Sequence, residues 1–375
     1  MANVLIAGGG FGGLITAKRL ASSLGDEHTV TVVSPLRTFT FYPALVKLAF
    51  GENTAEEISF DLASALKDAG VRFIRGEVTA VHPMSRKVTI AGDELNGNLA
   101  YDYLVLAFGR RLALGQIPGI KDHAHHMLGS GAAARFGEAV RVFRNGRIVL
   151  GSAPGSRLPV PVCETAFTLS RVFEDEMRSG DIKISVIFPH SLEHAFGGAK
   201  LHRELEEGFA KRGVAVHYNI PITEVTGSEV ISSDKHRIAY DLLLLIPPFR
   251  GWTMLRELGI TDDEDFIKVN EEMRVEGCSN TYAVGDCVSL PGPKLAHMAV
   301  DQAEVAAANI ISELRGEAPA AVYAHDIAAI IDAGGPESIF IRYDAGNGSD
   351  QLVRQGRFWS WAKETHDAFW RYRNR

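Results

Sequence analysis

The sequence predicts an α/β protein with two Rossmann-like dinucleotide-binding domains of the FAD/NAD(P)-binding type and a C-terminal amphipathic segment. An apolar strand at residues 3–7 runs directly into a Gly-x-Gly-x-x-Gly turn at residues 8–13 and then into a helix. Alternating strands and helices begin again near Arg147, and a strand ending in Gly-Asp follows at 281–286. Because strand–helix–strand order implies parallel sheets, two such series predict two doubly wound units.

Composition limits the class of protein. The chain has 375 residues, of which 46% are hydrophobic and 23% are charged, so we expect about two or three globular domains. A net charge of −7 argues against nucleic acid as the main partner. No apolar run approaches the roughly 20 residues of a membrane span, and no basic region precedes the first strand. Cys163, Cys278 and Cys287 lack CxxC and zinc spacing, so we predict no metal site and a reducing cytoplasm.

The first unit has the features of a dinucleotide site. The glycine turn lets backbone amides and a helix N-terminus meet a pyrophosphate. The second strand ends at Ser34, where NAD sites often carry an acid, so an NAD interpretation is weakened. Gly285-Asp286 in the same chain separates a flavoprotein from a simple dehydrogenase and makes FAD the predicted cofactor. The alternatives are an empty glycine-rich turn and a helix N-cap role for Asp286.

The second unit predicts a poor NAD(P)H site. Its first strand, near residues 148–150, is followed by a stretch that contains Pro154, Pro159 and Pro161 but no Gly-x-Gly. Prolines remove the amide donors that a pyrophosphate needs. We expect the next helix at Thr165 to Arg178.

Several separated segments carry a family resemblance. They are Phe39–Leu45, Asp102–Gly109, Ile246–Gly251, Pro293–Ala299 and Trp361–Lys363. In this order they resemble the motifs of the sulfide:quinone oxidoreductase group, flavoproteins close to flavocytochrome c sulfide dehydrogenase and to type II NADH dehydrogenase. The resemblance covers nearly the whole chain and implies noncovalent FAD and a C-terminal segment that faces membrane and quinone.

The motifs and the resemblance together predict a set of FAD-binding residues. Lys294 and the amides of Ala296 and His297 are expected to face the N1–O2 edge of the flavin, where positive potential stabilises the reduced form. A solvated lysine is the alternative. The full predicted set is Gly8, Gly10, Phe11, Gly12, Gly13, Ser34, Pro35, Arg37, Pro43, Val78, Ala107, Gly109, Arg110, Gly285, Asp286, Lys294, Ala296 and His297.

The candidate catalytic residues follow from where the chain departs from the family. Leu158 and Ala329 stand where sulfide-oxidising members carry cysteines beside the flavin. Cys163 is therefore a candidate relocated nucleophile, with a buried packing role as its alternative. His194 is a candidate for proton transfer, or a loop histidine without function. Glu164 is a candidate acid or base, or a residue at a helix N-terminus.

The tail from Leu352 to Arg375 predicts a basic, aromatic amphipathic helix. Such a helix suits an anionic membrane surface, which would place the flavin near quinone. A helix docked on the core or on a partner subunit is the alternative. The predicted aromatic stripe is Phe358, Trp361, Thr365, Phe369 and Tyr372, with Trp359 and Trp370 alongside, and the basic residues are Arg354, Arg357, Lys363, Arg371, Arg373 and Arg375.

The resulting hypothesis is an FAD-dependent oxidoreductase that passes electrons from a small donor, sulfide first, to a membrane quinone. The alternatives are an NAD(P)H:acceptor oxidoreductase and a catalytically altered flavoprotein with a binding or sensing role. We expect a peripheral position on the inner face of the cell membrane, and the oligomeric state, a homo-oligomer included, stays open. The predicted divisions are an FAD domain of 1–110 and 240–321, a second Rossmann-like domain of 111–239, and the segment 322–375.

Overall fold

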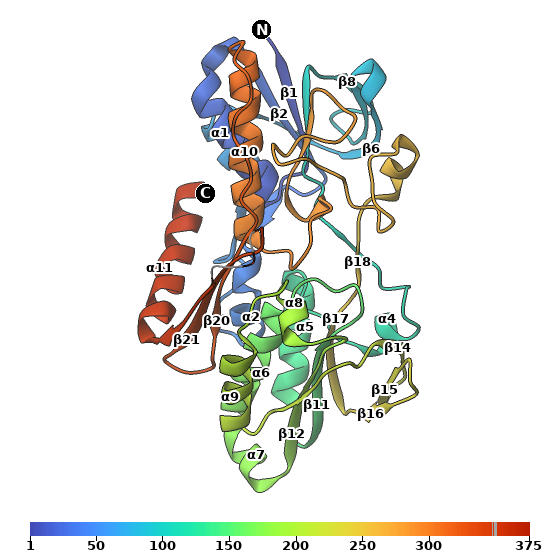
Figure 1. The fold of residues 1–375 in the computed structure, drawn as a ribbon, viewed down its shortest axis with the longest axis vertical. Helices are drawn as coiled ribbons and strands as arrows, with labels where there is room; N and C mark the ends of the chain where they lie inside the picture. Colours follow the sequence, from blue (N-terminus) through green and yellow to red (C-terminus); the bar gives the residue numbers. More distant parts are fainter. Residues whose placement is uncertain (347, 349–350) are drawn as a thin grey trace.

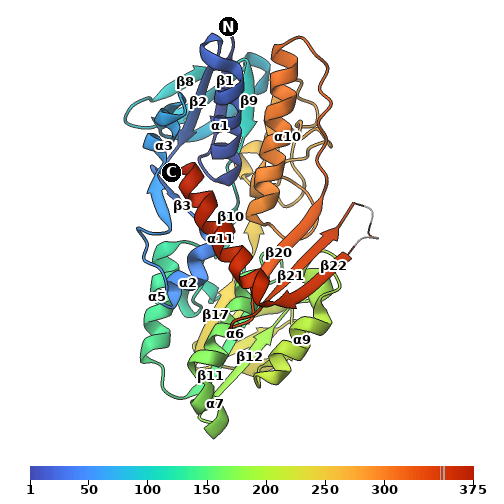
Figure 2. The ribbon, with the colours of Figure 1, turned by 90° about the vertical axis from the view of Figure 1, so that its left-hand side faces the viewer.

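A parallel five-stranded sheet organises the first half of the fold. The structure, a computed structural model, describes residues 1–346, 348 and 351–375. The sheet has the order β19-β9-β1-β2-β5, and every neighbouring pair is parallel. Helices α1 (Phe11–Leu24) and α10 (Ala296–Leu314) lie side by side on it (Figures 1 and 2). The strands are β1 (Asn3–Ala7), β2 (Thr29–Ser34), β5 (Arg72–Arg75), β9 (Tyr103–Leu106) and β19 (Thr281–Ala283).

A second parallel sheet, of order β13-β12-β11-β17, confirms the predicted fold class. One face of this sheet is covered by α6, α7 and α9, and the other packs against a small antiparallel sheet. The elements are β11 (Gly146–Ser152), β12 (Ile182–Ile187), β13 (Ala215–His217), β17 (Leu242–Ile246), α5 (Ser130–Val142), α6 (Val160–Val172), α7 (Glu174–Ser179) and α9 (His202–Lys211).

The helix expected at Thr165 to Arg178 differs from the observed structure. Helix α6 begins earlier, at Val160, and α7 follows after a break at Phe173. Pro159 is the N-cap of α6 and Pro161 lies in its first turn, where a missing N–H breaks no helical hydrogen bond. Prolines that looked like loop residues in the sequence therefore start a helix.

Two short strands lie where the chain crosses between the sheets. Strand β10 (Arg111–Leu112) pairs antiparallel with β18 (Phe249–Arg250). The predicted boundary at residue 240 assigned β17 to the FAD domain, but this strand pairs with β11 in the second sheet. The five consecutive buried apolar residues of β17 suit the interior of either parallel sheet, so the sequence did not distinguish them. We propose crossings at β10 and β18 as the domain limits.

Smaller elements complete the two units. They form a β3–β4 pair, a β6-β7-β8 sheet and a β14-β15-β16 sheet, all antiparallel. Their bounds are β3 (Thr38–Thr40), β4 (Ser59–Asp61), β6 (Glu77–His82), β7 (Lys87–Ala91), β8 (Gly97–Ala100), β14 (Ile222–Val225), β15 (Glu229–Ser232), β16 (Arg237–Ala239), α2 (Leu45–Ala49), α3 (Leu62–Asp68), α4 (Ile120–His123) and α8 (Leu192–Ala195).

The C-terminal segment lies across both units (Figure 2). Strands β20 (Asp326–Asp332), β21 (Ser338–Asp344) and β22 (Gln351–Gly356) form an antiparallel sheet that leads into helix α11 (Arg357–Asn374). Ile327, Ile331, Ile339 and Ile341 are buried and fix this sheet to the body of the protein. Within the described residues, no helix has the length and apolar character that crossing a membrane requires.

Helix α11 is amphipathic in the sense that the sequence predicted. Its inner face stacks Trp359 on Phe340, with ring centroids 4.1 Å apart, and pairs Lys363 with Glu164 of α6. Phe358, Trp361, Phe369 and Tyr372 point outward and are 60–82% exposed. The expected membrane face and the alternative docking face are therefore two sides of one helix.

Breaking the buried ion pair between Glu164 and Lys363 should destabilise the protein. In Glu164→Gln the Lys363 ammonium stays buried but loses its counter-charge, and we expect the free energy of unfolding to fall by about 3 kcal/mol. Adding Lys363→Met should recover most of this loss, because no uncompensated charge then remains. The measurement is the thermal unfolding midpoint followed by circular dichroism.

The matched control is Arg178→Met, which removes an exposed cation that pairs with Glu174 and Asp175. This change should alter the free energy of unfolding by less than about 1 kcal/mol. An unfolding midpoint for Glu164→Gln that equals that of Arg178→Met would contradict the role of the buried pair.

Candidate functional site

The glycine turn at residues 8–13, called the FAD-binding turn below after its predicted role, holds α1 close to the sheet. An added Cβ at Gly8, which has a φ of +120°, would lie 2.1 Å from the carbonyl oxygen of Ala107. An added Cβ at Gly13 would lie 2.0 Å from the carbonyl oxygen of Gly8. Because no side chain fits at either position, only glycine permits this approach of α1 to the ends of β1 and β9.

Gly10 has the opposite surroundings, and this difference supports a phosphate ligand. Gly10 is the N-cap of α1, and no side chain caps that helix end. An added Cβ at Gly10 would meet no protein atom within 4 Å. The first turn of α1 also carries no acidic residue. The helix N-terminus thus presents backbone amides and positive potential to open space, as a pyrophosphate requires.

The predicted ribose side of the site is formed at the end of β2. Ser34 is buried beside Gly9, and its hydroxyl accepts a hydrogen bond from the Leu36 amide at 3.2 Å. The exposed Arg37 guanidinium donates to Asp61 at 2.6 Å and holds the pKa of that carboxyl down at about 2. Pro35 is exposed, whereas Val78 on β6 is buried. Their contact with FAD stays a prediction.

A guanidinium–carboxylate pair lies between the two units. Arg110, next to Gly109, forms an ion pair with Asp286, and its guanidinium carbon lies 4.4 Å from the ring centroid of Phe249. The Arg110 Nε atom is buried, and none of the described residues accepts a hydrogen bond from it. Gly285 donates its amide to Gln302 Oε1 at 2.7 Å, which fixes the Gly-Asp turn to α10. The structure therefore brings together predicted residues from the turns that follow β9 and β19.

The N-terminus of α10 completes this part of the site. Lys294 is buried, its ammonium donates to the carbonyl of Val288, and burial together with Arg157 lowers its pKa to about 7. The solvated alternative for Lys294 is therefore wrong. The His297 ring accepts a hydrogen bond from the Ala328 amide at 3.2 Å, and burial lowers its pKa. No side chain caps α10, so the amides of Ala296 and His297 stay candidates for the flavin edge.

The catalytic candidates have contrasting surroundings. Cys163 is fully buried, and burial raises the pKa of its thiol, which favours the packing alternative over a thiolate nucleophile. His194 is exposed on α8, with its ring centroid 4.4 Å from that of His190. Among the described residues, no hydrogen bond or ion pair joins His194 to Cys163 or Glu164. Their roles stay predictions.

Glu164 occupies a buried polar site that the sequence only partly revealed. Its Oε1 accepts hydrogen bonds from Lys363 and from the Asp332 amide, the latter at 3.0 Å. Burial raises the pKa of Glu164, although the nearby Lys363 ammonium acts to lower it. The pKa of Lys363 is also raised, because the Glu164 carboxylate outweighs the lowering effect of burial. Sequence reasoning missed Lys363 as the partner and treated it as one of the surface cations. A lysine between Trp361 and Trp370 on the same helix was the available signal.

A cavity of about 310 Å³ lies next to this pair. Its lining includes Pro43, predicted to lie by the flavin, and Lys363 of α11. The cavity thus connects the predicted flavin region to the C-terminal helix. The remaining lining residues are Val46, Lys47, Phe50, Glu52, Glu164, Thr168, Arg171, Asp332, Gly334, Gly335 and Glu364.

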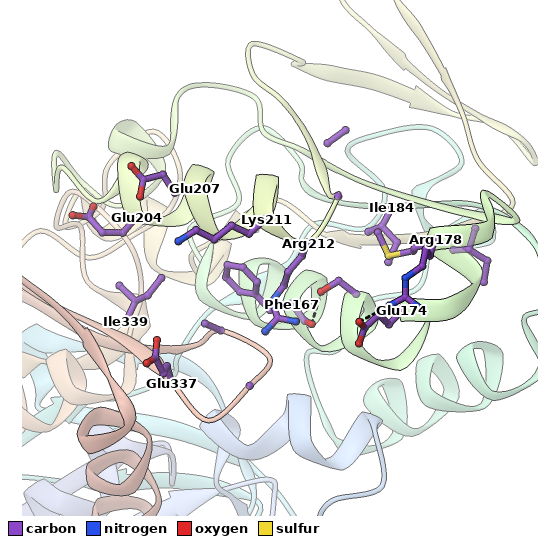
Figure 3. A pocket seen from close by; sticks show the side chains of 18 of the residues that line it. Phe167, Glu174, Arg178, Ile184, Glu204, Glu207, Lys211, Arg212, Glu337 and Ile339 are labelled. Carbon is purple, nitrogen blue, oxygen red and sulfur yellow. Dashed lines mark hydrogen bonds and ion pairs between the residues drawn. The ribbon is translucent and has the colours of Figure 1, made fainter.

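A larger cavity, of about 830 Å³, lies between the second unit and the C-terminal sheet (Figure 3). It is lined by α6, α7, α9, β12 and the turn between β20 and β21, and it contains no predicted FAD residue. Some of its charged groups are engaged within the protein: Arg178 pairs with Glu174, and Arg212 donates to the carbonyl of Gly334 at 3.1 Å. Glu204 Oε2 is buried without a hydrogen-bond partner among the described residues. This cavity is therefore separate from the candidate site.

Sequence relatives support the predicted resemblance. A mitochondrial sulfide:quinone oxidoreductase of Mus musculus is 27% identical over 312 residues, covering 78% of this chain and 67% of the relative. A sulfide-quinone reductase of Aquifex aeolicus is 26% identical over 339 residues, covering 84% and 77%. A demethylphylloquinone reductase of Synechocystis is 27% identical over 295 residues, covering 76% and 71%.

Solved structures agree on the fold. The sulfide:quinone oxidoreductase of Aquifex aeolicus superposes with a TM-score of 0.92 at 22% identity, over 100% of this chain and 92% of that one. The NDH2 of Plasmodium falciparum in complex with NADH superposes with a TM-score of 0.75 at 16% identity, over 97% and 93%. Residues 2–303 match the pyridine nucleotide-disulphide oxidoreductase family. The chain therefore belongs to that family and is an FAD-dependent oxidoreductase.

Proposed function

We propose that the protein passes two electrons from a small reduced donor to a membrane quinone, with sulfide as the donor. FAD, when bound, supplies the redox chemistry by taking up two electrons and passing them on. The relatives support the acceptor, because sulfide-quinone and demethylphylloquinone reductases both carry quinones in their names. The observation that carries the proposal is the cavity between Pro43 and α11.

The cavity has suitable properties for a quinone head group. Its volume of about 310 Å³ is at the lower end for small-molecule sites. Its lining includes the apolar side chains of Val46 and Phe50 and the polar side chains of Glu164 and Lys363. A quinone ring needs apolar contact for its faces and hydrogen-bond donors for its carbonyl oxygens, and this lining offers both.

Glu164 and Lys363 are in position to manage protons. Reduction of a quinone to the hydroquinone takes up two protons as well as two electrons. The Lys363 ammonium carries a proton on Nζ beside the cavity, and the Glu164 carboxylate, whose pKa burial raises, accepts a hydrogen bond from it and is placed to pass protons to it. We propose these two side chains as the proton relay to the acceptor.

The outer face of α11 supports a peripheral position on the inner face of the membrane. Trp361 and Phe369 are 61% and 60% exposed, and aromatic rings of this kind enter the lipid interface. The last turn of the helix adds the exposed Arg373, which attracts anionic lipid. Because α11 also lines the cavity, a long-chain quinone would have a short path from the bilayer to the site.

The donor side supports sulfide over NAD(P)H. Pro161 in the first turn of α6 has no amide, and the Val162 amide is already bonded to the carbonyl of Pro159 at 3.1 Å. Few free donors remain there for a dinucleotide pyrophosphate. Residue 158 is a leucine that packs in an apolar cluster with Met298 and Ile327. This position therefore has no thiol to carry sulfur. The proposed donor is therefore a small molecule such as sulfide and not a dinucleotide.

The FAD-binding turn should not tolerate a side chain at Gly10. In Gly10→Val the new methyl groups would fill the open space that the pyrophosphate needs, and we expect the affinity for FAD to fall at least about 100-fold. The measurement is the FAD content of purified protein and its dissociation constant by fluorescence. Gly115→Val, at an exposed turn where an added Cβ also meets no atom within 4 Å, is the control. Full, equally tight FAD in Gly10→Val would contradict this assignment.

Sulfide should reduce the bound flavin and NADH should do so poorly. The measurement is an anaerobic titration of the holoprotein with each donor, followed at the visible absorption band of the flavin. Rapid stoichiometric bleaching by NADH would instead establish the NAD(P)H:acceptor alternative. Bleaching by neither donor would favour the catalytically altered flavoprotein. Cys163→Ser should leave the sulfide titration unchanged, since the thiol is buried. If this variant were no longer reduced by sulfide, the hypothesis that Cys163 is a nucleophile would be restored.

Polar substitution of the outer face of α11 should detach the protein from lipid. In a variant with Phe358, Trp361, Phe369 and Tyr372 changed to Ser, the inner contacts of α11 remain. We expect at least tenfold weaker binding to anionic vesicles. Reduction of a long-chain quinone should slow accordingly, while reduction of a hydrophilic acceptor should not. Equal co-sedimentation of variant and wild type would leave α11 as a packing element.

A further inference from the structure

The inner face of α11 contacts the helix that begins at the FAD-binding turn. The Trp370 ring packs among three phenylalanines, with centroids 4.8 Å from Phe11, 5.3 Å from Phe39 and 5.3 Å from Phe41. Phe11 is the first residue of α1, so its backbone belongs to the segment that faces the pyrophosphate. A residue near the end of the chain therefore supports the start of the chain at the cofactor site.

The last turn of α11 is tied to the same region by hydrogen bonds. Lys18, also on α1, donates its ammonium to the carbonyl of Asn374 at 3.0 Å. Arg371 and Arg375 both donate to the carbonyl of Glu57, at 3.0 and 2.7 Å. Asn374 is itself buried. The end of α11 thus contacts α1 at its first residue and again at Lys18.

We infer that α11 holds the FAD-binding turn in place through Trp370, and that membrane binding and FAD retention strengthen each other. Trp370 is a positioning residue in this account, since it acts on FAD through Phe11. The lipid half of the inference rests on the proposed membrane contact. The two faces of one helix then serve two ligands: the outer aromatic residues meet lipid, and the inner Trp370 supports the cofactor site.

The polar groups on the inner face determine the sign of this coupling. Lys363 and Asn374 have their partners only when α11 lies against the protein. If α11 detached and lay in the lipid interface, Lys363 and the carbonyl of Asn374 would lose these partners. Burying a polar group without a partner costs free energy, which disfavours the detached helix. The docked helix presents the aromatic residues already ordered, so lipid should bind the docked form better. Linkage then requires FAD to tighten lipid binding by the same factor by which lipid tightens FAD.

The test is the rate of FAD release from the holoprotein, followed by the rise in fluorescence of free FAD. Trp370→Ala should speed release about tenfold or more, because it removes three ring contacts at Phe11, Phe39 and Phe41. Trp370→Phe should restore most of the retention. Trp359→Ala is the matched control, since Trp359 lies on the same helix but stacks on Phe340 of β21. It should leave the release rate near that of the wild type.

Vesicles of anionic phospholipid test the second half. They should slow FAD release from the wild type severalfold and have little effect on Trp370→Ala. Lys18→Met, which removes the tether to Asn374 without touching the aromatic rings, should speed release in the same direction and serves if Trp370→Ala does not fold. Circular dichroism checks the fold of each variant.

Each result separates the inference from the proposed function. Equal release rates for wild type, Trp370→Ala and Lys18→Met would overturn the role of α11 in retention. Vesicles that bind the holoprotein without changing release would overturn the coupling. Vesicles that do not bind at all would overturn the membrane proposal and with it the lipid half. A fast Trp370→Ala variant would, in that case, still establish the contact between α11 and the FAD-binding turn.

Discussion

The close approach of α1 to the carboxyl ends of β1 and β9 is the constraint on which the rest of the site depends. It exists because Gly8 and Gly13 have no side chains where carbonyl oxygens lie about 2 Å from any added Cβ. The approach fixes where the free amides at Gly10 point and where the Phe11 ring is held. Trp370 packs on that ring, so the position of the C-terminal helix also follows from two glycines near the start of the chain.

The second organising interaction is the buried ion pair of Glu164 and Lys363. It joins the second unit, through α6, to a helix that also packs on the C-terminal sheet and on the first unit. Two buried charges are costly to desolvate, so the pair adds little net stability compared with apolar residues. In the proposed reaction the pair would provide a fixed group that passes protons beside the cavity. A structural requirement and a chemical one are met by the same two side chains.

The sequence predicted the local features and missed the long-range ones. The first glycine turn, the strand at 103–107 and the outer stripe of α11 were legible because each depends on neighbouring residues or on one helical period. The start of α6 at Val160 was missed because proline signals a loop as readily as a first turn. The membership of β17 in the second sheet depends on pairing with β11, and a uniformly apolar strand carries no information about its neighbour.

The same distinction applies to the site. Gly8, Gly10, Gly13 and Asp286 follow from motifs, whereas Lys363 and Trp370 matter only because the chain returns to the first unit. The residues on the donor side likewise depend on their surroundings in the fold. Leu158 packs in an apolar cluster, and burial raises the pKa of the Cys163 thiol, so neither position offers a thiolate to relay sulfur. In the proposed reaction the protein would supply orientation and protons, and FAD, when bound, would supply the redox chemistry.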